Sequence, residues 1–496
     1  MACMDANLPP LIEALLEPPR YPHPVQQVEL VQTHISWLLL AGEFAYKIKK
    51  PLKLPFLDYS TLAQRKACCE EELRLNRRYA PDLYLDVVGV THTPQDPQLG
   101  GPGEPIEYGV KMRRFDESGR LDRVCVRGEL RASHLSELAD AVVAFHRVAQ
   151  AAPTGSRFGS ATEVMSQAQD NFHDLRQMLG NPDSQRRLAA LQAWTQAQFD
   201  KLGALMQARK AAGRVRECHG DLHLANLVLT GGKVTMFDCI EFNEDLRWID
   251  VASEIAFTYV DLLAHQRPGL AGWFVNEVLS RSGDYESVQV VQFYAVYRAL
   301  VRAKVAAIRG QQVADAADQA NAYLTMAERL ITPRPLRLVI THGVTGCGKT
   351  FITDRLLQRA PYASTLRLRS DVERKRLHGL ESADRSGSAI ESGIYTAAGH
   401  ARTYTHLREL AAMLLHAGWS VIVDAAFLKR ADRASFRALA LDAGADFSIL
   451  APQATPEQLR QRIEARAAHG LDASEGSLEV LELQLRTTEP LADDEQ

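Results

Sequence analysis

The chain contains 496 residues, more than one compact core usually holds, so two to four domains are expected. Its 46% hydrophobic and 24% charged residues are typical of a globular protein and exclude a fibrous or largely disordered chain. A formal net charge of −4 argues against a dedicated nucleic-acid binder but leaves a local basic site open. Without a membrane-length apolar run, a secretory signal or a C-x-x-C pair, the sequence predicts a cytoplasmic protein with reduced thiols and no membrane partner.

A proline-rich lead-in segment, residues 1–29, precedes a predicted small β-rich lobe at residues 30–115. Two strands joined by a short turn at Ala41-Gly42-Glu43 open this lobe, and the second strand carries Lys47 and Lys49 on one face. Kinases use a lysine that projects from a strand to hold the nucleotide α/β-phosphates. Lys47 is therefore a candidate nucleotide ligand; the alternative is a solvated lysine on an edge strand.

The same lobe contains a predicted helix at residues 62–79 with three consecutive glutamates. Because a kinase lysine pairs with a helix glutamate, we expect Glu72 to be the partner, with Glu71 as a close alternative. The remaining glutamates would be solvated. Paired strands predicted at residues 85–91 and 106–113 complete the lobe.

A cluster of polar residues lies further along the chain. His219, Asp221 and Asn226 have the H-x-D-x-x-x-x-N spacing of the kinase catalytic loop, in which Asp receives the substrate hydroxyl proton and Asn binds Mg²⁺. A short apolar strand then delivers Asp238, where a second metal-binding carboxylate is needed. This cluster predicts a site for phosphoryl transfer.

The residues around this cluster form a predicted helical lobe at residues 116–332. Apolar stripes at residues 188–205 and in the segment 288–308 recur at helical spacing, which is typical of core packing. Two prolines at 333 and 335 break any helix that runs into them and mark a domain boundary. The sequence thus predicts a kinase-like domain at residues 30–332 and a second domain at residues 333–496.

The second domain begins with an apolar strand that leads directly into a P-loop pattern, G-x-x-x-x-G-K-[ST], and then into a helix. Backbone N–H groups of such a loop surround phosphate oxygens, the lysine reaches the β/γ-phosphates and the hydroxyl binds Mg²⁺. The predicted ligands are Gly343, Val344, Thr345, Gly346, Cys347, Gly348, Lys349 and Thr350. Further strands at 365–368, 420–424 and 446–450 alternate with helices and predict a parallel sheet.

Other polar residues follow the strands of this domain. Asp371 is a candidate general base for a hydroxyl acceptor, with Arg374 holding the acceptor's polar groups. Asp424 ends a buried-type strand and could bind Mg²⁺, or it could be a structural strand-end residue. Arg462 and Arg466 share one face of a helix and fit a lid over the triphosphate, although surface arginines are an equal alternative.

The segments HGDLHLAN and FDCIEFN resemble the aminoglycoside phosphotransferase/choline kinase branch of the protein-kinase-like fold, in which HGD replaces HRD. The resemblance implies Asp221 as the catalytic base and Asn226 and Asp238 as Mg²⁺ ligands. It also implies Lys47 as the phosphate lysine and Glu72 as its partner.

The second half resembles the small P-loop kinases, a group that includes polynucleotide kinase, gluconate kinase and zeta-toxin-like kinases. Asp371 and Arg374 match the acceptor-side D-x-x-R of the polynucleotide kinase type. The whole chain resembles bacterial bifunctional aminoglycoside phosphotransferase/ATP-binding proteins. The expected fold is therefore multidomain, α/β and α+β: a bilobal kinase-like domain followed by a P-loop parallel-sheet kinase domain.

Three functional hypotheses follow. In the first, both halves bind ATP and Mg²⁺ and move a γ-phosphate to a hydroxyl of a small molecule. In the second, the P-loop half is the active kinase and the kinase-like half is a nucleotide sensor or pseudokinase, because the turn before Lys47 is short and not glycine-rich. In the third, the chain is a nucleic-acid 5′-hydroxyl kinase with an accessory binding domain, as its second half contains Arg355, Arg359, Arg367, Arg369, Arg374 and Arg376.

Overall fold

The computed structural model describes residues 8–54, 57–310, 316–359, 363–382, 384–385, 396–469 and 476–495. The chain forms two compact units. The first consists of Met1–Leu130, Phe145–Val164 and Ala204–Phe257. The second consists of Arg131–Ala144, Met165–Gly203 and Thr258–Gln496. The domain boundaries that the sequence predicts at residues 30 and 333 stay predictions. Among the described residues, no helix has the length and apolar character needed to cross a bilayer.

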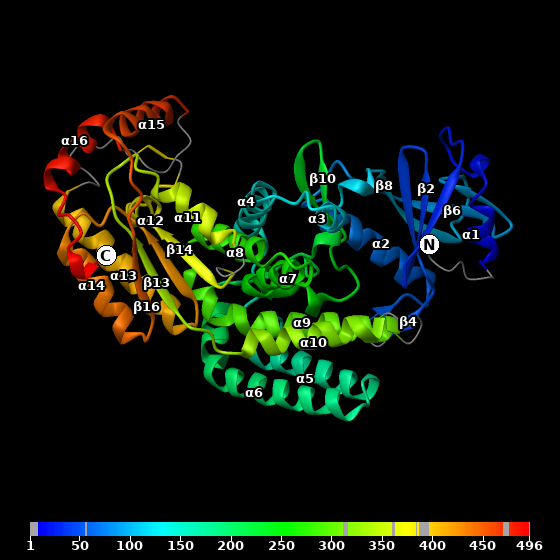
Figure 1. The fold of residues 1–496 in the computed structure, drawn as a ribbon. Coiled ribbons are helices and arrows are strands. Elements are labelled where there is room, and N and C mark those ends of the chain that lie inside the picture. Colours follow the sequence, from blue (N-terminus) through cyan, green and yellow to red (C-terminus); the bar gives the residue numbers. More distant parts are fainter. Residues whose placement is uncertain are drawn as a thin grey trace. The chain divides into compact units, whose positions relative to one another are not determined.

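A six-stranded antiparallel sheet forms the core of the small lobe (Figure 1). Its strands, in spatial order, are β1 (Val28–Gln32), β2 (Ser36–Ala41), β3 (Phe44–Lys49), β8 (Glu107–Arg113), β6 (Tyr84–Thr93) and β7 (Asp96–Leu99). The hairpin expected at 41–43 joins β2 to β3, and the expected strand pair is β6 with β8. Strand β7, which contains Pro97, is not expected from the sequence; proline is tolerated there because β7 is an edge strand.

Helices cover both faces of this sheet. The lead-in helix α1 (Pro10–Ala14) contributes Ile12 to a core with Leu39 and Tyr46. Helix α2 (Leu62–Asn76) contributes Cys69 to a second core with Leu40. Since Leu39 and Leu40 are consecutive in β2, their side chains point to opposite faces, and α2 therefore lies on the face opposite α1.

The remaining elements before residue 332 are mostly helical, as expected. They are α3 (Leu121–Val126), α4 (Ala132–Val148), α5 (Ala161–Met178), α6 (Pro182–Ala211), α7 (Val251–Ala264), α8 (Pro268–Ser282), α9 (Val288–Gly310) and α10 (Ala316–Ile331). Both predicted apolar stripes fall on helices, α6 and α9. Two antiparallel strand pairs frame the polar cluster: β9 (Val215–Glu217) with β12 (Trp248–Asp250), and β10 (Leu227–Thr230) with β11 (Lys233–Met236).

The second unit contains a four-stranded parallel sheet, as predicted, in the order β14-β15-β13-β16. Its strands are β13 (Arg337–Thr341), β14 (Thr365–Arg369), β15 (Ser420–Asp424) and β16 (Asp446–Leu450). The helices around it are α11 (Lys349–Leu357), α12 (Ser370–Leu377), α13 (Ala397–His416), α14 (Arg430–Asp442), α15 (Pro456–His469) and α16 (Leu478–Thr487). Because β15 lies beside β13, the carboxyl ends of these strands bring Asp424 and the P-loop to the same edge.

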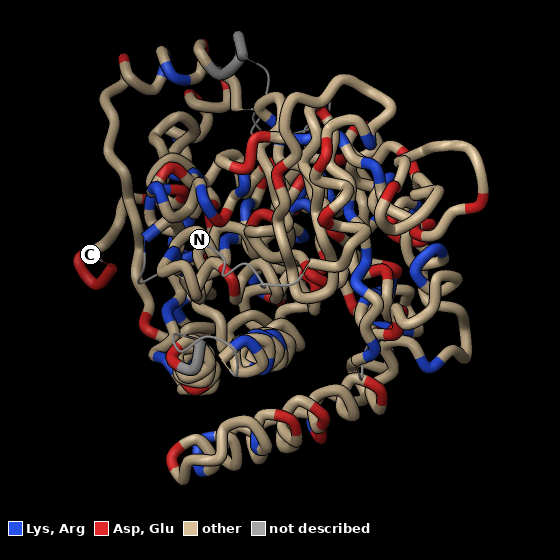
Figure 2. The backbone as a smooth tube through the Cα atoms, turned by 90° about the vertical axis from the view of Figure 1, so that its right-hand side faces the viewer, with Lys and Arg blue, Asp and Glu red and all other residues tan. Residues whose placement is uncertain are grey.

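Acidic and basic residues are interspersed among the other residues over the described backbone (Figure 2). This intermixing agrees with the small formal net charge of −4.

Candidate functional site

The loop from Gly343 to Thr350 connects β13 to α11 and depends on glycine at three positions. Gly343, Gly346 and Gly348 have positive φ angles of 140°, 82° and 99°, which side-chain-bearing residues rarely adopt. A Cβ added at Gly343 would lie 2.8 Å from Cys347 Sγ. The sequence folds this way locally because glycine alone allows the chain to turn so tightly between strand and helix.

Lys349 and Thr350 begin α11 at the carboxyl edge of the sheet. The Lys349 ammonium donates to the carbonyl oxygens of Gly343 and Val344, both at 2.9 Å. The Thr350 hydroxyl donates to Asp424 Oδ2 at 2.7 Å. This hydroxyl and carboxylate are oxygen ligands of the kind that Mg²⁺ prefers, so the donor set fits a magnesium ion beside the loop.

A cavity of about 600 Å³ lies next to this loop. It is lined by residues of the loop, of one face of α11, of the segment after β16 and of α15: Cys347, Gly348, Phe351, Arg355, Pro452 and Arg462 are among them. Arg462 Nη1 lies 3.3 Å from the Gly346 carbonyl oxygen. Arg466 belongs to the same helix, and its side chain lies outside the described residues.

The proposed acceptor pair lies on α12, directly after β14. Arg369, the last residue of β14, is the register partner of Asp424 in β15, so α12 starts at the same sheet edge as Asp424. Arg374 Nη1 donates to Asp371 Oδ1 at 2.9 Å. The Asp371 side chain is 28% exposed, so this carboxylate is accessible from solvent.

In the first unit, β3 and α2 bring Lys47 and Glu72 together beside Asp238. Lys47 Nζ donates to Glu72 Oε1 at 2.8 Å and to Asp238 Oδ1 at 2.6 Å. Burial opposes a charge on Lys47, but the two carboxylates outweigh it and raise its pKa above the ordinary value. Glu71, the alternative partner, instead contacts Arg74 and Arg247.

Lys49 shares a strand face with Lys47, as expected from the sequence, and has contacts that the sequence does not predict. Lys49 is fully buried; its ammonium donates to Glu72 Oε2 at 2.7 Å and also contacts Glu241. Tyr59 donates to the same Glu241 oxygen, Oε1, at 2.5 Å. Burial would raise the pKa of Glu72, but Lys47 and Lys49 outweigh this effect and lower it. Glu241 belongs to the segment FDCIEFN, but its partner Lys49 lies 192 residues away. No local sequence pattern therefore predicts that the two side chains meet.

The proposed catalytic loop holds Asp221 and Asn226 side by side. Asn226 Nδ2 donates to the Asp221 backbone oxygen at 3.0 Å and lies 3.2 Å from Asp221 Oδ2. His219 Nε2 lies 2.8 Å from the Phe237 carbonyl oxygen, and burial lowers the pKa of His219. This contact joins the loop to the backbone just before Asp238, consistent with a structural rather than chemical role for His219.

Asp238 itself has a left-handed backbone, with φ of 62°. Its amide donates to the Tyr84 hydroxyl at 3.0 Å, and the next amide, of Cys239, donates to Asn76 Oδ1 at 2.9 Å. The small lobe therefore holds the strand end that presents Asp238.

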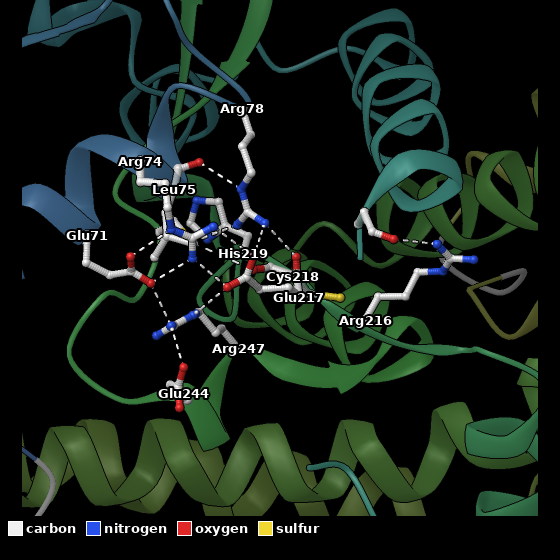
Figure 3. Close-up of polar contacts among 12 residues, drawn as sticks. Glu71, Arg74, Leu75, Arg78, Arg216, Glu217, Cys218, His219, Glu244 and Arg247 are labelled. Atoms are coloured by element: carbon white, nitrogen blue, oxygen red, sulfur yellow. Dashed lines mark hydrogen bonds and ion pairs between the residues drawn. The ribbon is translucent and has the colours of Figure 1, made fainter. Parts of the chain in front are cut away.

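An ion network connects α2 to the strand before the catalytic loop (Figure 3). Glu217 accepts from Arg74 at 2.7 Å and from Arg78 at 2.8 Å, and it lies 3.2 Å from Arg247 Nε. Because Glu217 is two residues before His219, this network fixes α2, which carries Glu72, against the loop.

Glu254 of α7 binds backbone amides of the proposed catalytic loop. Its Oε1 accepts from the amides of His219 and Gly220 at 2.5 and 3.0 Å, and its Oε2 lies 2.6 Å from His146 Nε2. Burial would raise the pKa of Glu254, but His146 and the loop contacts outweigh it and lower the pKa to about 2. The sequence analysis missed Glu254, because nothing in its helix pattern marks a residue that bonds backbone amides.

Two family models match separate parts of the chain. The phosphotransferase enzyme family matches residues 121–289, and the AAA domain matches residues 338–491. Together with the fold, these matches define the protein as an enzyme of the kinase class, whose domains imply the use of ATP. The expected combination of a kinase-like fold and a P-loop-type domain is confirmed.

Proteins similar in sequence along nearly the whole chain occur in mycobacteria. Uncharacterized proteins of Mycobacterium tuberculosis and Mycobacterium bovis are 30% identical over 456 residues, covering 91% of this chain and 89% of theirs. The chain belongs to the same family as these mycobacterial proteins.

Solved structures also resemble part of the chain. A choline kinase from Cryptosporidium parvum aligns with a TM-score of 0.40 and 12% identity, over 61% of this chain and 88% of its own. An aminoglycoside phosphotransferase from Alicyclobacillus acidocaldarius aligns with a TM-score of 0.36 and 15% identity, over 63% of this chain and 94% of its own.

Proposed function

We propose that this protein is an ATP- and Mg²⁺-dependent phosphotransferase with two nucleotide sites, which moves a γ-phosphate to a hydroxyl of a small molecule. One observation carries the proposal: in each proposed site, side chains of the kinds that bind phosphate or Mg²⁺ lie in direct contact with one another. Lys47 Nζ lies 2.6 Å from Asp238 Oδ1, and Thr350 Oγ1 lies 2.7 Å from Asp424 Oδ2.

In the P-loop site, backbone N–H groups of residues 343–350 and the Lys349 ammonium would bind the phosphates. Thr350 and Asp424 would hold the Mg²⁺, which supplies charge neutralisation between the phosphates when bound. The cavity of about 600 Å³ beside the loop offers room for the base and ribose, with Arg462 at its rim. Asp371 would accept the proton of the acceptor hydroxyl, while Arg374 orients that carboxylate and the acceptor.

In the kinase-like site, Lys47 would bind the α/β-phosphates with Glu72 holding its ammonium in place. Asn226 and Asp238 supply the oxygen atoms suited to Mg²⁺. Asp221 would receive the proton of the acceptor hydroxyl, and Asn226 Nδ2 lies 3.2 Å from its carboxylate oxygen Oδ2.

The test measures ADP formation with a panel of acceptors: sugars, amino alcohols, aminoglycosides, nucleosides and a 5′-hydroxyl oligonucleotide. We expect Lys349→Ala and Asp221→Ala each to abolish turnover with the acceptors of their own site. Lys429→Ala is the matched control, because Lys429 forms an exposed ion pair with Glu489 in the same domain as Lys349. A wild-type protein that binds no nucleotide at either site would contradict the proposal.

A second candidate function makes the kinase-like half a nucleotide sensor. Neither hairpin before Lys47 is glycine-rich: Thr33, His34 and Ile35 connect β1 to β2, and Gly42 and Glu43 connect β2 to β3. In that case Lys47→Ala would change the kinetics of the P-loop site without removing its product. Unchanged P-loop kinetics together with an active kinase-like site would rule the sensor out.

A further inference from the structure

Helix α12, which carries Asp371 and Arg374, is held from outside the P-loop domain by a buried tyrosine. Tyr285 lies in a short 3-10 turn between α8 and α9, and its hydroxyl donates to Glu373 Oε1 at 2.9 Å. Glu373 is fully buried and stands directly between the two proposed acceptor-side residues, two positions after Asp371 and one before Arg374. Tyr285 is 3% exposed, so this contact is shielded from water.

The charge of Glu373 makes the contact more than apolar packing. Arg376 Nε lies 3.1 Å and His406 Nε2 lies 3.4 Å from Glu373 Oε2. The other oxygen, Oε1, accepts from the tyrosine hydroxyl and, at the longer distance of 3.4 Å, from Arg376 Nη2. Burial would raise the pKa of Glu373, but His406, Arg376 and Tyr285 outweigh it and lower the pKa. Burial raises the pKa of Tyr285, so its hydroxyl keeps its proton and remains a donor.

The segment that contains α8 and Tyr285 contacts the P-loop domain at further points. Arg376 Nη2 donates to the Ser280 carbonyl oxygen at the end of α8. Asn276 of α8 accepts the backbone amide of Arg367 in β14 at 2.7 Å. Arg367 in turn donates from Nη1 to Thr353 Oγ1 at 2.8 Å, within the helix that follows the P-loop.

The close approach of α8 to the P-loop domain depends on two glycines. A Cβ at Gly269 would lie 1.9 Å from the Gln358 carbonyl oxygen, and one at Gly272 would lie 2.7 Å from that of Ala363. Backbone contacts this short leave little freedom for sliding, so α8 has one register against β14 and α11.

These contacts join the two family-matched regions. Tyr285 and Asn276 lie within residues 121–289, which match the phosphotransferase enzyme family, whereas Glu373 and Arg367 lie within residues 338–491 of the AAA match. We propose that Tyr285 is a positioning residue of the P-loop site: through Glu373 it fixes α12 and so places Asp371 and Arg374 for the acceptor. The inference rests on the proposed acceptor-side role of that pair.

Helix α12 is only eight residues long and starts at the sheet edge, so its own hydrogen bonds do not determine its rotation. Removing one partner of a buried carboxylate leaves charge imperfectly compensated, and the side chain shifts to recover a partner. A displacement near 1 Å of a catalytic group is enough to lower a rate by about 100-fold.

The experiment uses the full chain carrying Asp221→Ala, so that only the P-loop site turns over, with ATP and water as the acceptor, and follows phosphate release. We expect Tyr285→Phe to lower kcat about tenfold while the KM for ATP changes less than about twofold, because the loop from Gly343 to Thr350 is untouched. In an Asp371→Asn background the same substitution should have no further effect, since Tyr285 acts through that residue. Tyr297→Phe is the matched control: it removes a hydroxyl that contacts Gln167 at 3.2 Å, away from α12.

Several outcomes would overturn the inference. An equal loss of kcat in both backgrounds, or a rise in the KM for ATP alone, would make Tyr285 a general structural residue. Glu373→Gln keeps an oxygen acceptor for the tyrosine hydroxyl, so it should lower kcat less than Glu373→Leu. The reverse order would also contradict the proposed role of the Tyr285–Glu373 contact.

A second measurement separates this inference from the proposed function. If Lys349→Ala turns over ATP as fast as wild type, the P-loop site is not the active one and the proposed function fails there. Hydrogen exchange of the backbone amides at residues 370–377 then tests, independently of activity, whether Tyr285 holds α12 in place. Exchange at least tenfold faster in Tyr285→Phe than in Tyr297→Phe supports it, and equal exchange overturns it.

Discussion

The two proposed phosphate-handling centres are built by opposite means. The kinase-like centre assembles charged side chains from segments far apart in the chain: Lys47 comes from β3, Glu72 from α2 and Asp238 from the end of β11, 191 residues after Lys47. The P-loop centre uses eight consecutive residues whose backbone shape, rather than any ion pair, forms the cradle. One centre is therefore sensitive to the loss of a charge and the other to the addition of a methyl group.

This difference also separates stability from binding. In the kinase-like centre, two lysines and two glutamates form ion pairs in a largely buried site. Removing one of these charges should therefore change the free energy of unfolding. In the P-loop centre the glycines carry little packing, so their replacement should change nucleotide affinity more than stability. The following experiments test this division, from the largest expected effect to the smallest.

The largest effect is expected for Glu72→Gln. The substitution leaves Lys47 and Lys49 without their shared carboxylate in a buried site, and breaking a buried pair in this way costs about 3–5 kcal/mol. Urea denaturation measures the change. Glu70→Gln on the same helix is the control, because Glu70 is 57% exposed and 3.6 Å from Lys66; its effect should be under about 0.5 kcal/mol. Equal losses of stability in the two variants would contradict the view that the buried ion pairs of Glu72 stabilise this centre.

The next effect concerns acid. Glu254 has its pKa lowered from 4.5 to about 2, so its contribution to stability is complete above pH 4.5 and is lost as the pH falls toward 2. The shift corresponds to about 3 kcal/mol. Denaturation at pH 6 and pH 3 should show that Glu254→Gln loses less stability on acidification than wild type. Glu409→Gln, at an exposed position of α13, should behave as wild type. A Glu254→Gln variant with the full acid sensitivity would contradict the assignment.

A moderate effect on binding is expected for Gly343→Ala. The new methyl group meets Cys347 Sγ at 2.8 Å, and φ of 140° is unfavourable for alanine. The free loop should relax to relieve this strain of about 1–3 kcal/mol, and ATP binding would have to restore the strained shape, so the affinity at this site should fall by roughly 5- to 150-fold. A fluorescent ATP analogue, titrated in a Lys47→Ala background, reports this site alone. Gly379→Ala has φ of 72° and open space around its Cβ, so it controls for backbone strain elsewhere in the domain. Undiminished affinity of Gly343→Ala would show that the loop does not bind phosphate.

The smallest effect is expected for Arg462→Ala. This side chain is exposed and lies 3.3 Å from the Gly346 carbonyl oxygen, so its loss should weaken nucleotide binding only about fivefold, roughly 1 kcal/mol. The effect should shrink further at high salt because solvent screens an exposed charge. Arg460→Ala, exposed on the same helix, should leave affinity unchanged. If both substitutions weaken binding equally, α15 acts through general charge and not through a specific arginine.

The sequence predicted the P-loop region in most detail, because its information is local. A glycine pattern of eight residues, a strand before it and a helix after it each have their own signal, and all three appear at the expected residues. The parallel strands were also predicted to within one or two residues. The sheet order was not predictable, since β13 lies between β15 and β16, and no periodicity specifies such neighbours.

The kinase-like centre was predictable only in outline. Its catalytic-loop spacing and the pair of Lys47 with a helix glutamate came from a known arrangement, but Glu241, Tyr59 and Glu254 did not. Each of these is defined by a partner that is distant in sequence, such as Tyr59 with Glu241, 182 residues apart. The Tyr285–Glu373 contact was invisible for the same reason. The roles assigned to the site residues stay predictions.

The left-handed backbone at Asp238 restricts which amino acids this position can hold. Asparagine or glycine would accept φ of 62° but would lose the carboxylate beside Lys47, whereas glutamate would keep the charge on a backbone it adopts poorly. Aspartate satisfies both requirements at once. An exchange for glutamate, usually counted as conservative, should therefore be as harmful here as an exchange for asparagine, and for a different reason.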